Sequence, residues 1–179
     1  MRLTLGATVF LLCLAMWQPN ATVGSALAAS SLPAVELSAG SHGPREIEDL
    51  TRQKVVHDYA AAWQALALGL EQNRAQLLND YFTGVAKDEY IRTIREQIGT
   101  GIHRNYVDHG HKVEVLFYSP DGGVMQLQDD LQYDVQIYDG AKLLRSERTT
   151  ARFLVLMTPA ADRWMVRLLQ NVPASRLTP

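Results

Sequence analysis

The stretch V-M-Q-L-Q-D-D-L-Q-Y-D-V-Q-I-Y at residues 124–138 decides the fold class, because its apolar and polar side chains alternate. A period of two places one set on each face of a β-strand, whereas a helix would scatter both sets around its axis. The apolar set is Met125, Leu127, Leu131, Tyr133, Val135 and Ile137. Asp129 is the exception, since it is a carboxylate on the apolar face. The stretch predicts a long, half-buried strand with one acidic residue on its inner side.

Residues 1–28 have the features of a cleavable secretory signal peptide. Arg2 supplies a positive charge, residues 3–17 are mostly apolar, and the small residues Ala26 and Ala28 fit a cleavage site. The apolar stretch is shorter than the roughly 20 residues that a membrane-spanning helix needs. We therefore predict export to the periplasm or the extracellular space, with no stable membrane insertion after cleavage. The one cysteine, Cys13, lies in this segment, so the mature chain would have no thiol or disulfide chemistry.

Composition predicts one folded domain and excludes some partners. A chain of 179 residues that is 47% hydrophobic is long enough for one well-buried core. Cleavage after Ala28 would leave 16 basic and 19 acidic residues, a net charge of −3. A weakly acidic chain without a basic cluster argues against nucleic acid and against anionic membranes as partners.

The remaining chain divides into a lead-in, a helical part and a strand part. Residues 29–45 are rich in Ser, Gly and Pro and predict a flexible lead-in. An apolar stripe at three- and four-residue steps predicts a first helix from about residue 46, made of Val56, Tyr59, Trp63, Leu66 and Leu70. Asn73 and Gln76 resemble a capping box that starts a second helix at residues 74–82. A third helix is predicted at residues 86–98, with Gly99 as its stop. Residues 174–179 form a tail.

From residue 102 onward the period changes to two, which predicts four antiparallel strands in a meander. With a three-residue loop at residues 139–141, Met125 would face Val155 and Leu127 would face Phe153. The last hairpin would pair Phe153 with Leu168, Val155 with Val166 and Met157 with Trp164. The predicted fold is α+β, with three N-terminal helices on one face of a curved four-stranded sheet.

This order of elements resembles the nuclear transport factor 2-like superfamily, whose fold is a cystatin-like α+β cone. The resemblance covers residues 46–173 and includes the stretch L-L-N-D-Y-F-T-G-V-A at residues 77–86. It implies that helices and a bent sheet enclose a pocket. The superfamily includes isomerases and dehydratases as well as domains without catalysis, so the resemblance implies a fold and leaves the function open.

The inner face of the predicted meander contains a candidate pocket. In the predicted register Asp129, Leu131 and Tyr133 face Ala151, Thr149 and Glu147, with Trp63 of the first helix above them. A carboxylate in an apolar cavity has a raised pKa and can act as a general base. Asp129, Tyr133 and Glu147 are therefore the candidate catalytic residues. The alternative is a β-bulge at residues 129–130 that turns Asp129 toward solvent.

A second candidate site is the segment H-R-N-Y-V-D-H-G-H at residues 103–111, which contains His103, His109 and His111. In an extended segment the H-x-H spacing places His109 and His111 on one face, as two ligands of a zinc or copper ion would be. The alternative is a polar loop leading into the first strand.

These observations leave three functional hypotheses. The leading one is a non-catalytic exported domain that binds a small apolar ligand or an envelope protein partner. The second is a cofactor-independent isomerase or dehydratase with Asp129 as the base, and the third is a metal-binding protein. No cofactor is expected, and the polar outer face of the sheet predicts a monomer or a weak homodimer.

Overall fold

The computed structural model describes residues 31–39 and 44–173. The predicted signal peptide at residues 1–28 and the tail at residues 174–179 lie outside these ranges. The elements in chain order are β1 (Val35–Ala39), α1 (Asp49–Glu71), the 3-10 helix η1 (Ala75–Leu78), α2 (Gly84–Thr100), β2 (Ile102–Tyr118), β3 (Met125–Asp139), β4 (Lys142–Pro159) and β5 (Trp164–Asn171). The predicted α+β class is confirmed.

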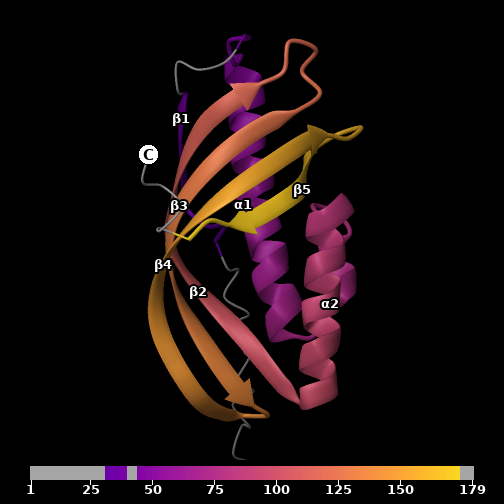
Figure 1. The fold of residues 1–179 in the computed structure, drawn as a ribbon, viewed down its shortest axis with the longest axis vertical. Coiled ribbons are helices and arrows are strands. Elements are labelled where there is room, and N and C mark those ends of the chain that lie inside the picture. Colours follow the sequence, from indigo (N-terminus) through magenta and orange to yellow (C-terminus); the bar gives the residue numbers. More distant parts are fainter. Residues whose placement is uncertain (1–30, 40–43, 174–179) are drawn as a thin grey trace, which may run out of the picture. The chain divides into compact units, whose positions relative to one another are not determined.

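The described strands form one mixed sheet in the order β1-β2-β3-β4-β5, with α1 and α2 on one face (Figure 1). Strands β2 to β5 are the predicted antiparallel meander. The prediction of four strands is wrong by one, because Val35–Ala39 pairs in parallel with residues 111–115 of β2. These five residues come from the segment predicted to be a flexible lead-in. Their alternation, V-E-L-S-A, is short and lies next to Ser- and Gly-rich sequence.

Two of the three predicted helices are α-helices, and the second is a single 3-10 turn. Asn73 adopts a left-handed backbone (φ 53°), so the chain turns sharply there and makes no capping box. The N-cap of η1 is Arg74, which has no side-chain capping bond. Helix α2 continues through Gly99 and ends at Thr100. Its C-cap is Gly101, whose φ of 71° is the left-handed conformation that favours glycine.

The faces of β3 and β4 are as predicted, but their register is displaced by two residues. Met125 pairs with Met157 and Leu127 with Val155, where the sequence predicted Val155 and Phe153. The hairpin loop has two residues, and an irregularity after Ile137 adds a third unpaired position. This extra residue restores apolar against apolar pairing, which a two-residue loop alone would not give.

The β4–β5 hairpin also differs from its predicted pairing. Met157 pairs with Val166 and Val155 with Leu169, across an irregularity between residues 156 and 157. As a result Leu169 is buried, and Leu168, which was predicted to point inward, is only half-buried. Inserting one residue in a strand reverses the face of everything beyond it, and hydrophobicity alone does not reveal where it is inserted.

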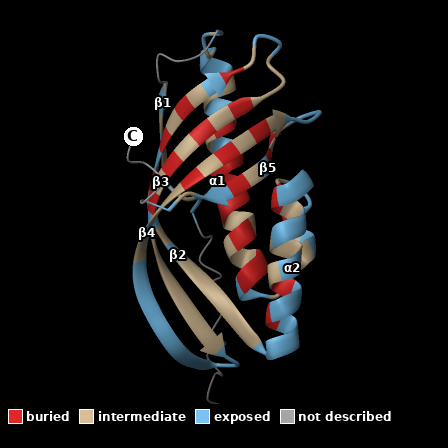
Figure 2. Cartoon of the chain, in the orientation of Figure 1, coloured by how far each residue is buried: buried red, intermediate tan, exposed pale blue. Residues whose placement is uncertain are grey.

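The buried core is concentrated in one half of the sheet, where α1 packs against β2 to β5 (Figure 2). We call residues 102–108, 133–139 and 142–149 the distal half of the sheet; its residues are half-buried or exposed. The inner face is the side that carries Asp129. Within the core, buried Asp58 of α1 accepts a hydrogen bond from the Trp164 backbone N–H at 2.7 Å, which fixes α1 to β5. None of the described helices has the length and apolar character needed to cross a membrane.

Candidate functional site

Four side chains from three elements form a continuous hydrogen-bonded chain, which we call the carboxylate network: Tyr59, Asp129, His111 and Asp108. The Tyr59 hydroxyl donates to Asp129 Oδ2 at 2.6 Å, and His111 Nδ1 lies 2.7 Å from the same oxygen. His111 Nε2 lies 2.6 Å from Asp108 Oδ2. The side chains of His111 and Asp129 have no exposed surface, while that of Asp108 is 24% exposed. The network therefore leads from the core to the edge of the distal half.

Local backbone structure explains how His111 enters the core. The pairing of β2 with β3 is irregular between Asp108 and His111, and Gly110 there has φ of 123°, a conformation that L side chains rarely adopt. This bulge adds a residue and turns the imidazole inward. Asp108 Oδ1 accepts a hydrogen bond from the Gly110 backbone N–H at 2.7 Å, which fixes the turn.

Aromatic rings close around the imidazole on the helix side. The Trp63 and His111 ring centroids are 5.0 Å apart, and the Tyr59 ring meets the imidazole edge-on at 5.8 Å. Tyr59 and Trp63 are four residues apart on α1, so both project from the same face of the helix. The rings exclude water and leave the carboxylates as the polar partners of the imidazole.

Burial and charge together set the ionisation of the network. Burial opposes a charge on His111, but hydrogen bonds to Asp108 and Asp129 and their negative charges outweigh it and raise the pKa of His111 to about 9. Burial, reinforced by the charge of Asp129, raises the pKa of Tyr59 well above its ordinary value. At neutral pH the imidazole is therefore a cation between two carboxylates, and the phenol is a neutral donor.

This arrangement leaves the network poorly suited to acid–base catalysis. Both ring nitrogens of His111 are directed at carboxylates, so the charged imidazole has no free lone pair. Asp129 Oδ2 accepts two donors and its side chain reaches no solvent. Asp129 Oδ1 and Trp63 Nε1 are buried and have no hydrogen-bond partner among the described residues. The geometry is that of a buried ionic connection between α1, β2 and β3.

The residues predicted to line one pocket are divided between the buried core and the distal half of the sheet. Trp63, Asp129 and Leu131 are buried in the core. Tyr133 and Thr149 are paired in the distal half and are half-buried. Glu147 pairs with Val135 instead of Tyr133, and its carboxylate is exposed beside Arg145. The two-residue register displacement thus separates Glu147 from its predicted position.

The three histidines of the predicted metal site do not converge. His111 is inside, whereas His109 Nε2 is on the outer face, 2.9 Å from Asp134 Oδ2. His103 stacks on Tyr138 with ring centroids 5.1 Å apart. The bulge at Gly110 reverses the face of His111, so the expectation that His109 and His111 share a face is wrong. Within the described residues, no group of three or more His, Cys, Asp or Glu side chains is placed to hold a metal ion.

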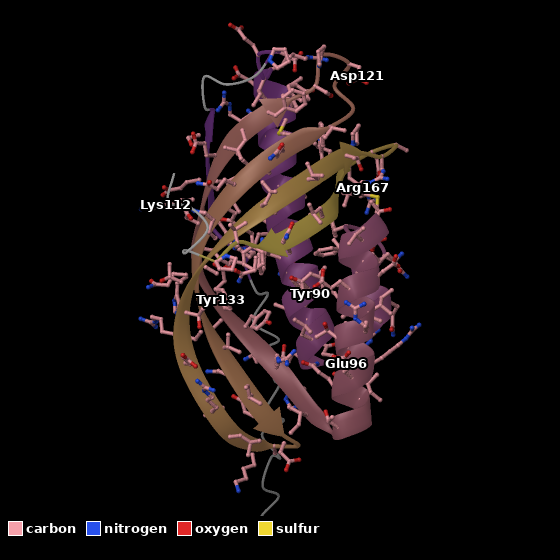
Figure 3. All side chains as sticks on the ribbon, in the orientation of Figure 1. Tyr90, Glu96, Lys112, Asp121, Tyr133 and Arg167 are labelled. Atoms are coloured by element: carbon pink, nitrogen blue, oxygen red, sulfur yellow. The ribbon has the colours of Figure 1, made fainter. Side chains whose placement is uncertain are left out.

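A second feature lies on the inner face of the distal half, where two tyrosines are in contact and a third is close enough to interact with them electrostatically. The rings of Tyr106 and Tyr133 are 5.3 Å apart and nearly edge to face. Tyr90 of α2 lies at the level of Tyr133 along the long axis of the molecule (Figure 3). Burial is the main cause of the raised pKa of Tyr90, and electrostatic coupling to Tyr106 and Tyr133 adds to it. We call Tyr90, Tyr106 and Tyr133 the tyrosine cluster.

Sequence reasoning did not find Tyr59 and Asp108 as members of the network, nor Tyr90 and Tyr106 as neighbours of Tyr133. Tyr59 was assigned to the apolar stripe of the first helix. Asp108 was assigned to the candidate metal-binding segment or, as the alternative, to a polar loop. The available signal was Gly110 inside a strand-forming segment, because an isolated glycine there indicates a bulge. A bulge between Asp108 and His111 is what allows the two side chains to meet.

Comparison with known proteins supports the fold. No protein-family model matches the sequence, and no curated protein matches it. The intermembrane space region of the chloroplast protein ARC6 superposes with a TM-score of 0.59 at 12% identity, covering 73% of this chain and 100% of that one. A structure from Catenulispora acidiphila gives a TM-score of 0.50 at 12% identity, covering 71% and 96%. A putative scytalone dehydratase from Novosphingobium aromaticivorans gives 0.45 at 11% identity, covering 70% and 87%.

The first two likenesses show the fold: the chain folds as a nuclear transport factor 2-like cone, as the order of its elements predicted. At such low identity they show the fold alone, so the function has to come from the residues of this chain.

Proposed function

We propose that this protein is an exported, non-catalytic domain that binds a small apolar ligand on the inner face of the distal half of its sheet. The observation that carries the proposal is the tyrosine cluster, which packs at the border of the core, with Tyr106 and Tyr133 on strands that continue past it and Tyr90 on α2. Tyr106 and Tyr133 are only half-buried, and Val135 and Ile137 on the same face are half-buried as well. Aromatic and aliphatic side chains with incomplete cover are the usual lining of ligand sites.

The proposal of export rests on the sequence of residues 1–28, with its positive start, apolar stretch and small residues before the cleavage position. An envelope protein partner is the alternative occupant of the same face. A peptide or protein would extend over the exposed β4 edge, whereas a small molecule would contact the tyrosines alone.

Catalysis by Asp129 is less consistent with the geometry. A general base must come within hydrogen-bonding distance of the proton it removes. Asp129 has no exposed surface, and one of its oxygens already accepts hydrogen bonds from Tyr59 and His111. A substrate would have to displace the core to reach it, so we favour binding over reaction.

The test uses the uncharged apolar dye N-phenyl-1-naphthylamine with the mature protein. We expect saturable dye fluorescence that falls strongly in Tyr106→Ala and Tyr133→Ala. Tyr138→Ala is the matched control, since Tyr138 is on β3 near Tyr133 but on the outer face, stacked on His103. Organic extraction followed by mass spectrometry should also detect a co-purifying small molecule. Equal dye binding by all three variants, or no binding by the wild type, would contradict the proposal.

A further inference from the structure

The hydroxyl groups of the tyrosine cluster are available to donate hydrogen bonds to a ligand. The hydroxyls of Tyr90, Tyr106 and Tyr133 make no hydrogen bond within the described part of the chain, and each tyrosine has a pKa raised chiefly by burial. They therefore remain protonated and able to donate. A ligand with an acceptor group would give these hydroxyls hydrogen bonds that the described residues do not supply.

Arg104 adds a positive charge to the same face. It pairs with Ile137 in the β2–β3 register, two residues before Tyr106, so it lies on the side that carries Tyr106 and Val135. Its charge acts on the phenol of Tyr106, favouring the ionised form and partly opposing the burial that raises the pKa of that group. Arg104 and Tyr106 thus share a face of β2 and interact electrostatically.

Arg104 differs from three other arginines of this sheet region, which are neutralised by carboxylates. Arg145 pairs with Glu147, Arg148 with Asp134, and Arg152 with Asp130. Arg104 is half-buried, yet it has no carboxylate or hydrogen-bond acceptor among residues 31–39 and 44–173. Its guanidinium is therefore available to an anion, and its planar set of donors fits a carboxylate in two-point geometry.

The acidic group nearest to the tyrosine cluster on β2 does not fill this role. Asp108 faces Tyr133 across the β2–β3 pair, but its Oδ2 is held by His111 and its Oδ1 by the Gly110 backbone N–H. Asp108 therefore belongs to the carboxylate network, and the cation of Arg104 stays uncompensated by the described residues. Glu147, whose partner Val135 lies on this face, is paired with Arg145, so a ligand would supply the negative charge that Arg104 lacks.

We propose that the ligand is an amphipathic carboxylate whose head group is bound by Arg104 and whose apolar body lies on Tyr106 and Tyr133. This inference rests on the proposed function and adds the charge of the ligand. The edge-to-face arrangement of Tyr106 and Tyr133 gives the body an aromatic surface. The phenol O–H groups and the guanidinium supply the donors that the carboxylate oxygens accept.

The experiment displaces N-phenyl-1-naphthylamine from the full mature chain with four probes: decanoate, 2-naphthoate, decanamide and decyltrimethylammonium. Comparing decanoate with 2-naphthoate shows whether the site prefers a ligand with an alkyl body or one with an aromatic body. Decanamide has the same chain as decanoate without the charge, and the ammonium probe reverses the charge. We expect decanoate to compete at least about tenfold more strongly than decanamide, which is the scale of one charge-assisted hydrogen bond.

Two variants test whether Arg104 causes the preference for decanoate over decanamide. Arg104→Gln should reduce the preference for decanoate over decanamide to about one, with the thermal midpoint of unfolding as the check on folding. Arg95→Gln is the matched control, because Arg95 is an exposed arginine on α2 and should keep the preference.

The outcomes separate this inference from the proposed function. If the dye binds and depends on Tyr106 and Tyr133, but decanamide or the ammonium probe competes as well as decanoate, the inference is overturned and the binding function stands. If Arg104→Gln keeps the full preference for decanoate, the role of Arg104 is overturned. If the dye does not bind to the wild type, both proposals fail.

Discussion

His111 and Asp129, 18 residues apart in the sequence, meet in the core with 2.7 Å between imidazole Nδ1 and carboxylate Oδ2. The second ring nitrogen of His111 reaches Asp108, so one buried imidazole connects two carboxylates. A charged group without exposed surface is stable only when it is paired and hydrogen-bonded. The stability of this domain should therefore depend strongly on the carboxylate network.

Replacing Asp129 tests the buried pair directly. Asp129→Asn keeps the shape of the side chain but removes its charge, and breaking a buried ion pair lowers the free energy of unfolding by about 3 kcal/mol. Asp130→Asn is the control, because the neighbouring carboxylate pairs with Arg152 on the partly exposed outer face, where such pairs contribute about 0–1 kcal/mol. Urea unfolding measures the free energy of unfolding of both variants. Equal losses of unfolding free energy in the two variants would show that the buried pair of Asp129 stabilises the fold no more than the exposed pair of Asp130 does.

The raised pKa of His111 predicts a pH dependence of stability. The folded pKa is about 9 against an ordinary value of 6.5, so the folded state holds this proton more tightly than the unfolded state does. The stabilisation is complete below about pH 6.5 and is lost as the pH rises through 9, with a size of roughly 3 kcal/mol. Urea unfolding at pH 6, 8 and 9.5 should show this decline.

The control for the pH series is His111→Gln, which is expected to be less stable at pH 6 and nearly flat over the same range. An NMR titration of the histidine ring protons should place the midpoint of His111 well above neutrality. A wild-type protein that is as stable at pH 9.5 as at pH 6 would contradict the charged state of the imidazole.

The Tyr59 hydroxyl should contribute measurably to stability. Tyr59→Phe removes the 2.6 Å hydrogen bond to Asp129 Oδ2, and hydrogen bonds to charged groups contribute about 1.5–3 kcal/mol. Tyr118→Phe is the matched control: Tyr118 is 4% exposed, and its hydroxyl has no hydrogen-bond partner among the described residues. Thermal unfolding should separate the two variants. If Tyr118→Phe is the more destabilising, the hydrogen bond from Tyr59 to Asp129 does not stabilise the fold to the expected extent.

The glycine in the β2 bulge is predicted to be essential for the placement of His111. Gly110→Ala forces a side chain into a backbone conformation with φ of 123°, which costs about 1–3 kcal/mol although the nearest atom to an added Cβ, Ala34 O, is 3.9 Å away. Gly99→Ala is the contrast, because Gly99 lies in α2 and an added Cβ would meet no described atom within 4 Å. It should be neutral or stabilising by up to about 1 kcal/mol.

Calorimetry compares the two glycine variants, and the histidine titration reports whether the imidazole has left its site. If Gly110→Ala is as stable as the wild type and its His111 midpoint is unchanged, the bulge is not what directs His111 inward.

The sequence alone determined the class of fold and the faces of the main strand. Alternation at residues 124–138 is a local property with a period of two, so it survives any change of pairing partner. It correctly placed Leu127 and Leu131 on the inner face, but it left open whether Asp129 faces the core or turns to solvent; the structure buries Asp129. The apolar stripe of α1 likewise correctly placed Tyr59 and Leu66 inward.

Only the tertiary structure decided which residues meet. Register depends on loop length and on bulges, and each bulge inserts one residue without changing the composition of a strand. The bulge at Gly110 brought His111 to Asp129, and the irregularity after Ile137 moved Glu147 away from Tyr133. The hydrogen bond from Tyr59 to Asp129 joins residues 70 positions apart. Such a contact exists only when α1 packs on the sheet, so no local pattern contains it.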